Sequence, residues 1–568
     1  MQIYGNVIAG GVAMGKVCFQ HTDYDRFLKD YRPAKPDIEK IRFNNAVSQA
    51  KGDLNELIAS GRTTKEGLDV LKSHLAIVID PSLENMVFSF IDQDMSAPKA
   101  VIAAINSISA SFDALEDDFT RERAADISDS GKRILRKLLA MEEPAFPDED
   151  IIIFADNIEP SVMAGFSEEH VKAVFLANPS ETSHAVIIAK SKDFITVTGF
   201  DSSKYRLEEN DTVIVDTFDN SLIIDPTTSD VFNYNKKRKS WNSKRTSMLN
   251  RAGFPAQTTD GKEFTIAANI SSPQGMDKAV KYGCSGIGLY RSEFLFMKSK
   301  KLPSEDEQFL AYKSVVTKTD NELCVIRTLD IGGDKNCACI NLPHEENPGL
   351  GFRGVRFSLE NKEIFKTQLR AILRASAFGK VAIMIPMITT LYEIKKCKRI
   401  LTECKKELDS KGIAYDKAMQ FGIMIETPAA CLMADIFAKH VDFFSIGTND
   451  LIQYTYAADR NNPAVAHFFD CYEPAVIHAI YNVVTAAHKA DIWVGICGEV
   501  ASNPTMLPFF LALDVDELSM TSSSIPAIKE QIRHMPSDLC DIQAILALDS
   551  TKKVQNYLTS LMADVKEQ

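Results

Sequence analysis

Cationic side chains recur in the second half of the chain, at or after the ends of short apolar runs. Most of them are arginines, whose planar guanidinium groups match the oxygens of phosphates and carboxylates. One such arginine alone is usually a surface or ion-pair residue, but several together at strand ends indicate a small ligand with more than one anionic group. The candidates are Arg291, Arg327, Lys335, Arg353 and Arg460.

Two acidic residues, Glu426 and Asp450, come at or just after the ends of two neighbouring apolar runs. Carboxylates held near a phosphate usually share a hard divalent cation, typically Mg²⁺, with water completing its coordination. Two acids alone are a weak signal, and the arginines strengthen it because a cation would neutralise phosphate charge. Asn449 can donate a hydrogen bond to the same anion.

Cys497 ends another apolar run and precedes Gly498 and Glu499. A buried structural thiol is the default for one cysteine among 11. The position at a strand end favours a proton donor in the pocket instead.

Eight short apolar runs, separated mostly by helical segments, must position these side chains. Eight βα repeats predict a (β/α)8 barrel over residues 255–568, and catalytic residues of such barrels lie at the C-terminal ends of the strands. The runs are 264–269, 286–290, 324–330, 382–387, 422–426, 443–447, 493–497 and 517–520.

The first half divides differently. Residues 1–20 and 144–228 predict an α/β domain, residues 21–143 an inserted helical subdomain with helices at 38–59, 65–79, 98–122 and 127–141, and residues 229–254 a linker helix.

In the α/β domain, residues 182–190 predict a helix with Thr182 or Ser183 as its N-cap, which places His184 in the first turn. A histidine there can accept a phosphoryl group, because the helix dipole and free N–H groups face the new negative charge. A histidine that merely packs or caps is the more frequent case on position alone.

Composition limits the function classes. The 568 residues carry 64 Lys and Arg against 77 Asp and Glu, a net charge of −13, which argues against a general nucleic-acid binder. No apolar run is long enough to span a bilayer and no signal peptide is visible, so membrane insertion is not expected. The 11 cysteines are scattered, with Cys337 and Cys339 as the one close pair, which indicates reduced thiols and a cytoplasmic protein.

Five motifs together resemble the phosphoenolpyruvate-utilising enzymes, and more narrowly the enzyme I family of bacterial sugar phosphotransferase systems. They are GIGLYRSEFLFM at 286–297, RTLDIGGDK at 327–335, ETPAA at 426–430, FFSIGTNDL at 443–451 and CGE at 497–499. The resemblance covers nearly the whole chain.

The resemblance implies a cytoplasmic phosphotransferase that uses phosphoenolpyruvate and Mg²⁺, passes phosphate to the phosphocarrier protein HPr for sugar transport, and dimerises through the barrel. It implies that His184 accepts the phosphoryl group and that Thr182 orients its ring. Cys497 then protonates enolpyruvate, and Glu426 and Asp450 hold Mg²⁺. Phosphoenolpyruvate would be held by Arg291, Arg327, Lys335, Arg353, Asn449 and Arg460.

One segment departs from the family pattern. Before the histidine the family has Gly-Gly-Arg-Thr-Ser-His, whereas this chain has Pro179, Ser180 and Glu181 before Thr182, and Lys190 replaces a usual arginine. An acid near a phosphohistidine is unfavourable if it points inward. The departure leaves open a regulatory paralogue that binds phosphoenolpyruvate with impaired or redirected transfer, although no N-terminal sensor domain is seen. A dikinase or phosphoenolpyruvate synthase would need an ATP-binding domain, for which residues 1–255 offer no glycine-rich module.

Overall fold

The computed structural model describes residues 2–567 apart from several short segments and single residues. The residues outside the description are 4, 21–26, 30, 60–64, 114–117, 142–148, 159, 168, 178–183, 193, 298–300, 333–336, 338, 341, 344, 461 and 463. The chain forms two compact units, Met1–Ser243 and Lys244–Gln568.

The first unit contains a mixed sheet, seven-stranded over the described residues, in the order β1-β5-β4-β3-β2-β6-β7. Strand β2 runs parallel to β3 and antiparallel to β6, so residues from the beginning of the chain pair with strands that follow far later. Strand β2 therefore lies in the same sheet as strands of the later α/β segment. The strands are β1 Asn6–Ala9, β2 Val12–Gln20, β3 Ile151–Ala155, β4 Val171–Leu176, β5 Ile195–Thr198, β6 Thr212–Asp216 and β7 Ser221–Ile224.

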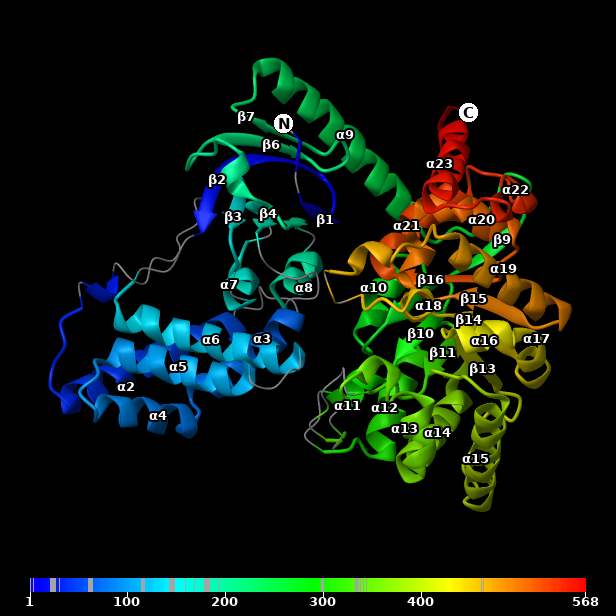
Figure 1. The fold of residues 1–568 in the computed structure, drawn as a ribbon, viewed down its shortest axis with the longest axis horizontal. Helices are drawn as coiled ribbons and strands as arrows, with labels where there is room; N and C mark the ends of the chain where they lie inside the picture. The colour runs from blue at the N-terminus through cyan, green and yellow to red at the C-terminus, as the bar shows by residue number, and fades with distance from the viewer. Residues whose placement is uncertain are drawn as a thin grey trace. The chain divides into compact units, whose positions relative to one another are not determined.

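Helices between β2 and β3 form a bundle with its own apolar core, which includes Phe43, Leu71 and Val101. Helix α3 of the bundle also packs against α7 and α8 of the α/β part (Figure 1). The helices are α2 Pro36–Ala59, α3 Lys65–Val78, α4 Pro81–Ile91, α5 Ala97–Asp113, α6 Asp118–Leu138, α7 Pro160–Gly165 and α8 His184–Ser191.

Two predicted helix boundaries in this bundle are wrong. The predicted helix 98–122 runs past the end of α5 at Asp113, and α6 begins at Asp118, well before residue 127. A continuous helical pattern of apolar spacing does not mark where one helix stops and the next begins. At its other end α6 stops at Leu138, and Ala140 adopts a left-handed φ of 50° that a helix cannot continue through.

Helix α9 extends over Thr228–Asn250. In the first unit its Tyr234 is buried beside Val12 and Ile214. In the second unit the chain just after α9 is held by α21 (Ile525–Ile532), where Lys529 Nζ donates hydrogen bonds to the carbonyls of Ala252 at 3.0 Å and Phe254 at 3.3 Å.

The second unit contains a closed barrel of parallel strands, eight of them in the described residues. Strand β9 pairs with β10 on one side and β16 on the other, which closes the ring and confirms the (β/α)8 prediction. The strands are β9 Glu263–Ile270, β10 Ile287–Arg291, β11 Cys324–Arg327, β12 Val381–Ile385, β13 Gln420–Ile425, β14 Phe443–Ile446, β15 Trp493–Ile496 and β16 Glu517–Thr521.

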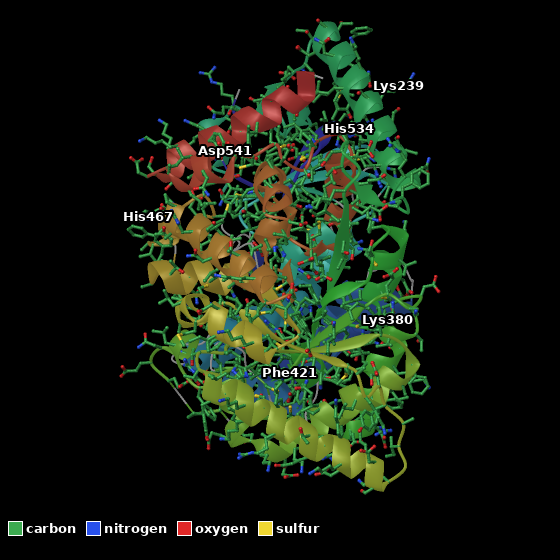
Figure 2. All side chains as sticks on the ribbon, turned by 90° about the vertical axis from the view of Figure 1, so that its right-hand side faces the viewer. Lys239, Lys380, Phe421, His467, His534 and Asp541 are labelled. Atoms are coloured by element: carbon green, nitrogen blue, oxygen red, sulfur yellow. The ribbon has the colours of Figure 1, made fainter. Side chains whose placement is uncertain are left out.

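These strands consist largely of apolar residues, which explains why they are buried on both faces. Inside the ring lie side chains such as Leu289, Val325 and Met424, and outside it the strands pack against helices. Figure 2 draws the side chains on the ribbon and labels Phe421 in β13 and Lys380, which directly precedes β12.

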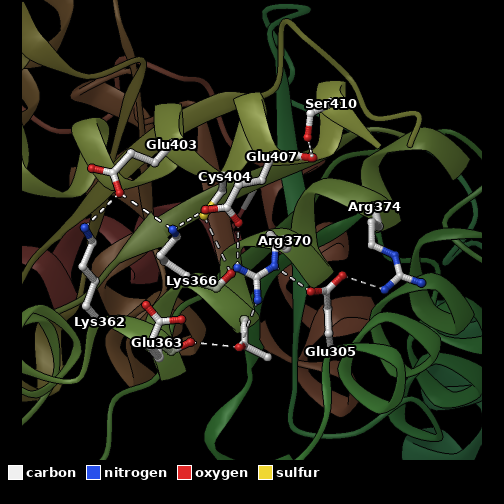
Figure 3. Close-up of polar contacts among 11 residues, drawn as sticks. Glu305, Lys362, Glu363, Lys366, Arg370, Arg374, Glu403, Cys404, Glu407 and Ser410 are labelled. Carbon is white, nitrogen blue, oxygen red and sulfur yellow. Dashed lines mark hydrogen bonds and ion pairs between the residues drawn. The ribbon is translucent and has the colours of Figure 1, made fainter. Parts of the chain in front are cut away.

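Helices surround the barrel, and three of them are joined by ion pairs on the outer surface. Arg370 of α14 lies between Glu305 of α12, with Nε 2.6 Å from Oε2, and Glu407 of α15, with Nη1 3.0 Å from Oε2 (Figure 3). The principal helices are α10 Gly275–Lys281, α11 Glu293–Met297, α12 Glu305–Val316, α13 Val355–Glu360, α14 Lys362–Ala375, α15 Leu391–Ser410, α16 Pro428–Leu432, α17 Ala434–Phe437, α18 Thr448–Tyr456, α19 Pro474–Lys489, α20 Leu507–Ala512, α22 Ile542–Leu546 and α23 Thr551–Glu567.

In the described residues no single helix has the length and apolar character needed to cross a membrane. The bent pair Val70–Val78 and Pro81–Ile91 meets those two criteria only when taken together.

Candidate functional site at the C-terminal ends of the barrel strands

The ends of three neighbouring barrel strands lie at one level. Ile425 of β13 is the register partner of Ile446 of β14, which in turn is the partner of Ile496 of β15. The next residues along the chain, Glu426 and Cys497, therefore leave the barrel at the same height. Parallel strands place two of the predicted site residues together in this way.

Two predicted arginines are also neighbours through strand register. Arg291 at the end of β10 is the partner of Arg327 at the end of β11. Arg327 is 6% exposed, whereas Arg291 is half-buried. The barrel therefore presents two guanidinium groups from adjacent strands at the edge where Glu426 and Cys497 emerge.

Asp330 holds two of the arginines. Its Oδ2 lies 3.0 Å from Arg353 Nη2 and 3.3 Å from Arg327 Nη1, and its Oδ1 lies 3.4 Å from Arg353 Nε. Arg353 also donates from Nη1 to the hydroxyl of Tyr454 at 3.3 Å, and that hydroxyl donates to the carbonyl of Gly349. Because the contacts of Asp330 are buried, the directions of both guanidinium planes are fixed before a ligand arrives.

Glu293 is the second acidic partner of Arg327, with Oε1 2.6 Å from Nη2. Burial alone lowers the pKa of the Arg327 guanidinium, but Glu293 and Asp330 outweigh that effect and raise it. Arg327 is therefore a permanent buried cation held between two carboxylates.

The carboxylate of Glu426 is buried and only partly satisfied. Its Oε1 accepts a hydrogen bond from the backbone nitrogen of Met387 at 2.6 Å, and its Oε2 has no hydrogen-bond partner among the described residues. Burial, followed by the charges of Asp450 and Asp330, raises the pKa of Glu426 to about 8. A buried carboxylate oxygen that lacks a donor is suited to a cation.

Asp450 lies in the first turn of α18, and its Oδ1 is likewise buried with no hydrogen-bond partner in the part of the chain that the structure describes. No group of three or more metal-binding side chains occurs among those residues. Glu426 and Asp450 thus fit a hard cation that takes its remaining ligands from water and from a bound anion, which is the usual way in which proteins hold Mg²⁺.

Cys497 follows β15 and is buried beside these charges. Its Sγ lies 3.6 Å from the carbonyl oxygen of Ile446. Burial raises the pKa of the Cys497 thiol to about 11, although Ser445 and Arg327 pull it downward. The thiol therefore keeps its proton at neutral pH, as a general acid requires.

The remaining predicted residues of the barrel lie less deeply. Arg460 follows α18, with Nη1 3.8 Å from Oδ1 of Asp450. Asn449 precedes Asp450 in α18, and its Oδ1 accepts a hydrogen bond from the backbone nitrogen of Glu499 at 3.1 Å, so its amide nitrogen is the end that can donate to a ligand. Lys335 lies outside the described residues.

The predicted phosphoryl acceptor belongs to the first unit. Helix α8 begins at His184, and its Val186 and Ala189 pack in the core under the sheet. The description does not extend to the side chains of His184 and Lys190. Thr182 and the departure at Pro179, Ser180 and Glu181 also lie outside the described residues.

Asp330 and Glu293 were not among the predicted site residues, although both stand inside motifs that were recognised. Asn269 was also missed. Its Nδ2 donates hydrogen bonds to the carbonyl of Cys497 at 2.9 Å and to that of Ser519 at 3.2 Å. These three side chains hold other site residues in place. The position of an acidic residue in the sequence does not show which arginine it contacts in the fold.

Three family models match consecutive parts of the chain. They are described as the PEP-utilising enzyme N-terminal domain at residues 4–123, the mobile domain at residues 146–219 and the PEP-binding domain at residues 246–537. The last of these contains the arginines, carboxylates and thiol described above.

Curated relatives match along nearly the full length. A phosphoenolpyruvate-protein phosphotransferase of Bacillus sp. (strain S) is 38% identical over 98% of this chain and 97% of its own length. Proteins of the same name from Bacillus subtilis (strain 168) and Staphylococcus aureus (strain MRSA252) are 37% and 36% identical, each over 98% of this chain and 99% of its own length.

Proposed function

Because the chain belongs to the phosphoenolpyruvate-protein phosphotransferase family of phosphoenolpyruvate-utilising enzymes, we propose how its own residues divide the reaction. His184 takes the phosphoryl group from phosphoenolpyruvate and passes it to a histidine of the phosphocarrier protein HPr, and pyruvate is released. The observation that carries the proposal is the cluster of arginines beside two buried carboxylates at the ends of the barrel strands.

The substrate matches this cluster in charge. Phosphoenolpyruvate has a phosphate and a carboxylate, and Arg291, Arg327 and Arg353 can bind both because a guanidinium group donates in a planar fork. Arg460, Asn449 and Lys335 complete the proposed set. The ion pairs from Asp330 to Arg327 and Arg353 support the proposal because they orient both guanidinium groups in advance.

Glu426 and Asp450 are the proposed ligands of Mg²⁺. When bound, the cation would neutralise charge on the phosphoryl oxygens. The oxygens Glu426 Oε2 and Asp450 Oδ1 support the proposal because, within the described residues, neither has a hydrogen-bond donor.

The proposed reaction uses a nucleophile and a proton donor of this chain. A ring nitrogen of neutral His184, with Thr182 orienting the ring, attacks phosphorus in line as the P–O bond breaks, and the electron pair goes to the enolate oxygen. The enolate carbon then takes the proton of Cys497, which yields pyruvate and a thiolate that regains its proton from solvent. His184 and the barrel residues belong to different units, so the proposal includes a domain movement.

The helical bundle is the proposed docking surface for HPr. Its helix α3 packs against α8, the helix that begins at His184, so a carrier bound to the bundle would be near the phosphorylated residue. We also propose a cytoplasmic homodimer that serves sugar transport. A second copy would cover apolar side chains of the barrel unit such as Leu432, which is 83% exposed, and Tyr392, which is 68% exposed.

Labelling with phosphoenolpyruvate that carries radioactive phosphate tests the function. We expect Mg²⁺-dependent label that is labile in acid and stable in base, as a phosphohistidine is. The label disappears in His184→Ala and remains in His170→Ala, which changes another histidine of the same unit. Added HPr then removes the label from the wild-type chain.

Label that survives in His184→Ala refutes the assignment of the acceptor. Normal binding of phosphoenolpyruvate without any label supports the second candidate, a regulatory paralogue. The replacement of the usual glycines and arginine by Pro179, Ser180 and Glu181 is the observation that favours this candidate.

A further inference from the structure

Cys337 and Cys339 form a thiol pair beside the candidate site. Their Sγ atoms lie 3.0 Å apart, and Cys339 Sγ also donates to the carbonyl oxygen of Phe296 at 3.4 Å. Both are free thiols in the structure. Cys337 is buried, whereas Cys339 is half-buried and can be reached by a small reagent. Neither thiol has a part in the proposed reaction.

The surroundings of this pair favour a disulfide over a metal ion. Soft metal ions in proteins are normally held by three or four sulfur or nitrogen ligands. Within the described residues no third histidine, cysteine or carboxylate joins the two thiols. A disulfide needs no third ligand, only two thiols and an oxidant, and these sulfur atoms need to approach by about 1 Å to reach its bond length.

A small apolar cluster connects the pair to the arginines. Cys337 packs in this cluster with Leu329 and Ile331, the two residues that flank Asp330. Half-buried Phe352, the residue before Arg353, packs against the same cluster, as does Cys339. The chain neighbours of both Asp330 and Arg353 therefore pack in the cluster that contains the thiols.

We propose that Cys337 and Cys339 form a reversible disulfide under oxidising conditions, and that this bond weakens the binding of the anionic substrate in the barrel. The second half of the proposal rests on the proposed function, since it takes phosphoenolpyruvate as the anion. Interiors are close-packed, so a sulfur displacement of about 1 Å in the cluster is transmitted to the segments that carry Asp330 and Arg353.

Oxidised glutathione supplies the oxidising equivalents. The sulfur of Cys339 attacks one glutathione sulfur, the glutathione disulfide breaks, and the first glutathione leaves as a thiol. The sulfur of Cys337 then attacks Sγ of Cys339 and releases the second glutathione, so that two protein thiols and one oxidised glutathione give one protein disulfide and two glutathione thiols. Burial and the neighbouring Cys337 raise the pKa of Cys339 to about 12, so an excess of oxidant over hours is needed.

Mass spectrometry of the full chain after treatment with oxidised glutathione tests the bond. We expect the peptide that contains both cysteines to lose about 2 Da, the mass of two hydrogens, and to regain it with dithiothreitol. In Cys337→Ser the same peptide instead keeps one glutathione on Cys339. In Cys18→Ser, which changes a cysteine of the first unit, the disulfide still forms. Absence of the disulfide in the wild-type chain overturns the proposal.

Calorimetric titration with phosphoenolpyruvate and Mg²⁺ tests the effect of the bond. We expect the oxidised chain to bind at least about three-fold more weakly, with full recovery on reduction and no effect of the oxidant on a Cys337→Ser, Cys339→Ser double variant. Equal affinity of the oxidised and reduced chains overturns the coupling. A reduced chain that does not bind phosphoenolpyruvate refutes the proposed function instead, and the mass measurement still decides whether the disulfide exists.

Discussion

Asp330 and Arg353 form a two-point ion pair at the edge of the barrel, with Oδ2 3.0 Å from Nη2 and Oδ1 3.4 Å from Nε. Both side chains are at most 2% exposed. The same carboxylate also contacts Arg327, which Glu293 holds as well, so one acidic residue helps to orient two of the proposed anion-binding groups.

We predict that Asp330→Asn lowers kcat/KM for phosphoenolpyruvate. The amide keeps the shape of the side chain but removes the charge that holds both arginines, and a buried hydrogen bond to a charged group contributes about 1.5–3 kcal/mol, or roughly 10- to 100-fold. Steady-state kinetics of pyruvate release measures the effect, with circular dichroism as a check of folding. Asp306→Asn changes an exposed aspartate that pairs with Arg374 and is the control. An unchanged kcat/KM in Asp330→Asn would show that the arginines need no such anchor.

We predict that Glu426→Gln removes the stabilisation of the protein by Mg²⁺ and phosphoenolpyruvate. At about 100 times its Kd, a ligand that binds only the folded state adds about 2.7 kcal/mol to the free energy of unfolding. Thermal unfolding of the wild-type chain should therefore shift upward when both ligands are added, whereas Glu426→Gln should show little shift. Glu403→Gln, in the outer ion-pair network of Figure 3, should respond as the wild type does. An equal shift in Glu426→Gln contradicts the assignment of this carboxylate to the cation.

We predict that Cys497→Ala slows the formation of pyruvate by about 10²- to 10⁴-fold, the usual contribution of a general acid. Since burial raises the pKa of Cys497 to about 11, the thiol is protonated at every pH below that value. The pH profile of pyruvate release in the wild type should therefore show no decline due to this group up to about pH 10. Cys284→Ala, which changes a cysteine outside the site, is the control. A loss of activity that follows thiol ionisation near pH 8.5 in the wild type, and that is absent in Cys497→Ala, would contradict this account.

We predict that Glu517→Gln stabilises the chain in alkaline solution. Glu517 is buried inside the barrel, in space left by Gly288, where a Cβ atom would lie 2.3 Å from its Oε1. Burial, and after it the charge of Asp516, raises the pKa of Glu517 from 4.5 to about 7. A folded-state pKa above the unfolded one means that the folded chain holds the proton more tightly, so the contribution to stability is complete below pH 4.5 and is lost as the pH rises through 7.

The loss for Glu517 amounts to about 3 kcal/mol, at 1.36 kcal/mol per pKa unit. Urea unfolding at pH 5 and pH 8.5 measures the change. The free energy of unfolding of the wild type minus that of Glu517→Gln should be lower at pH 8.5 than at pH 5. The same comparison of the wild type with Glu499→Gln should show no such change. Parallel pH dependences of the wild type and Glu517→Gln would show that the carboxyl finds a compensating partner.

The barrel could be predicted because each of its strands is a short apolar run that ends in polar residues. The strand ends are less well marked. The run 324–330 extends beyond β11, which ends at Arg327, and the run 382–387 extends beyond β12, which ends at Ile385. Leu329 and Ile331 are as apolar as strand residues, yet they are buried in the small cluster with Phe296 and not in the barrel. Burial of an apolar residue can be predicted from its type, but the partner against which it packs cannot.

Helix α4 lies outside the predicted helices, although local residues in the sequence mark its beginning. Asp80 accepts a hydrogen bond from the backbone nitrogen of Ser82 and Pro81 is the first helical residue, a standard beginning for a helix. The residues that begin α4 are neighbours in the sequence, so this signal can be recognised there. The partners of Asp330 and Asn269 cannot be recognised in this way, because they lie on segments that meet only in the folded barrel.

The closure of the barrel has a consequence for how the chain is made. Strand β9 pairs with β16, and the register partners Thr265 and Glu517 are separated by roughly 250 residues of sequence. During synthesis the ring is therefore an open sheet with two exposed edges until β16 has left the ribosome. Closing it is a late and slow event, and edges of this kind are prone to pair with other chains. A chain truncated before Glu517 should aggregate, even though it would still carry the arginines, both carboxylates and Cys497.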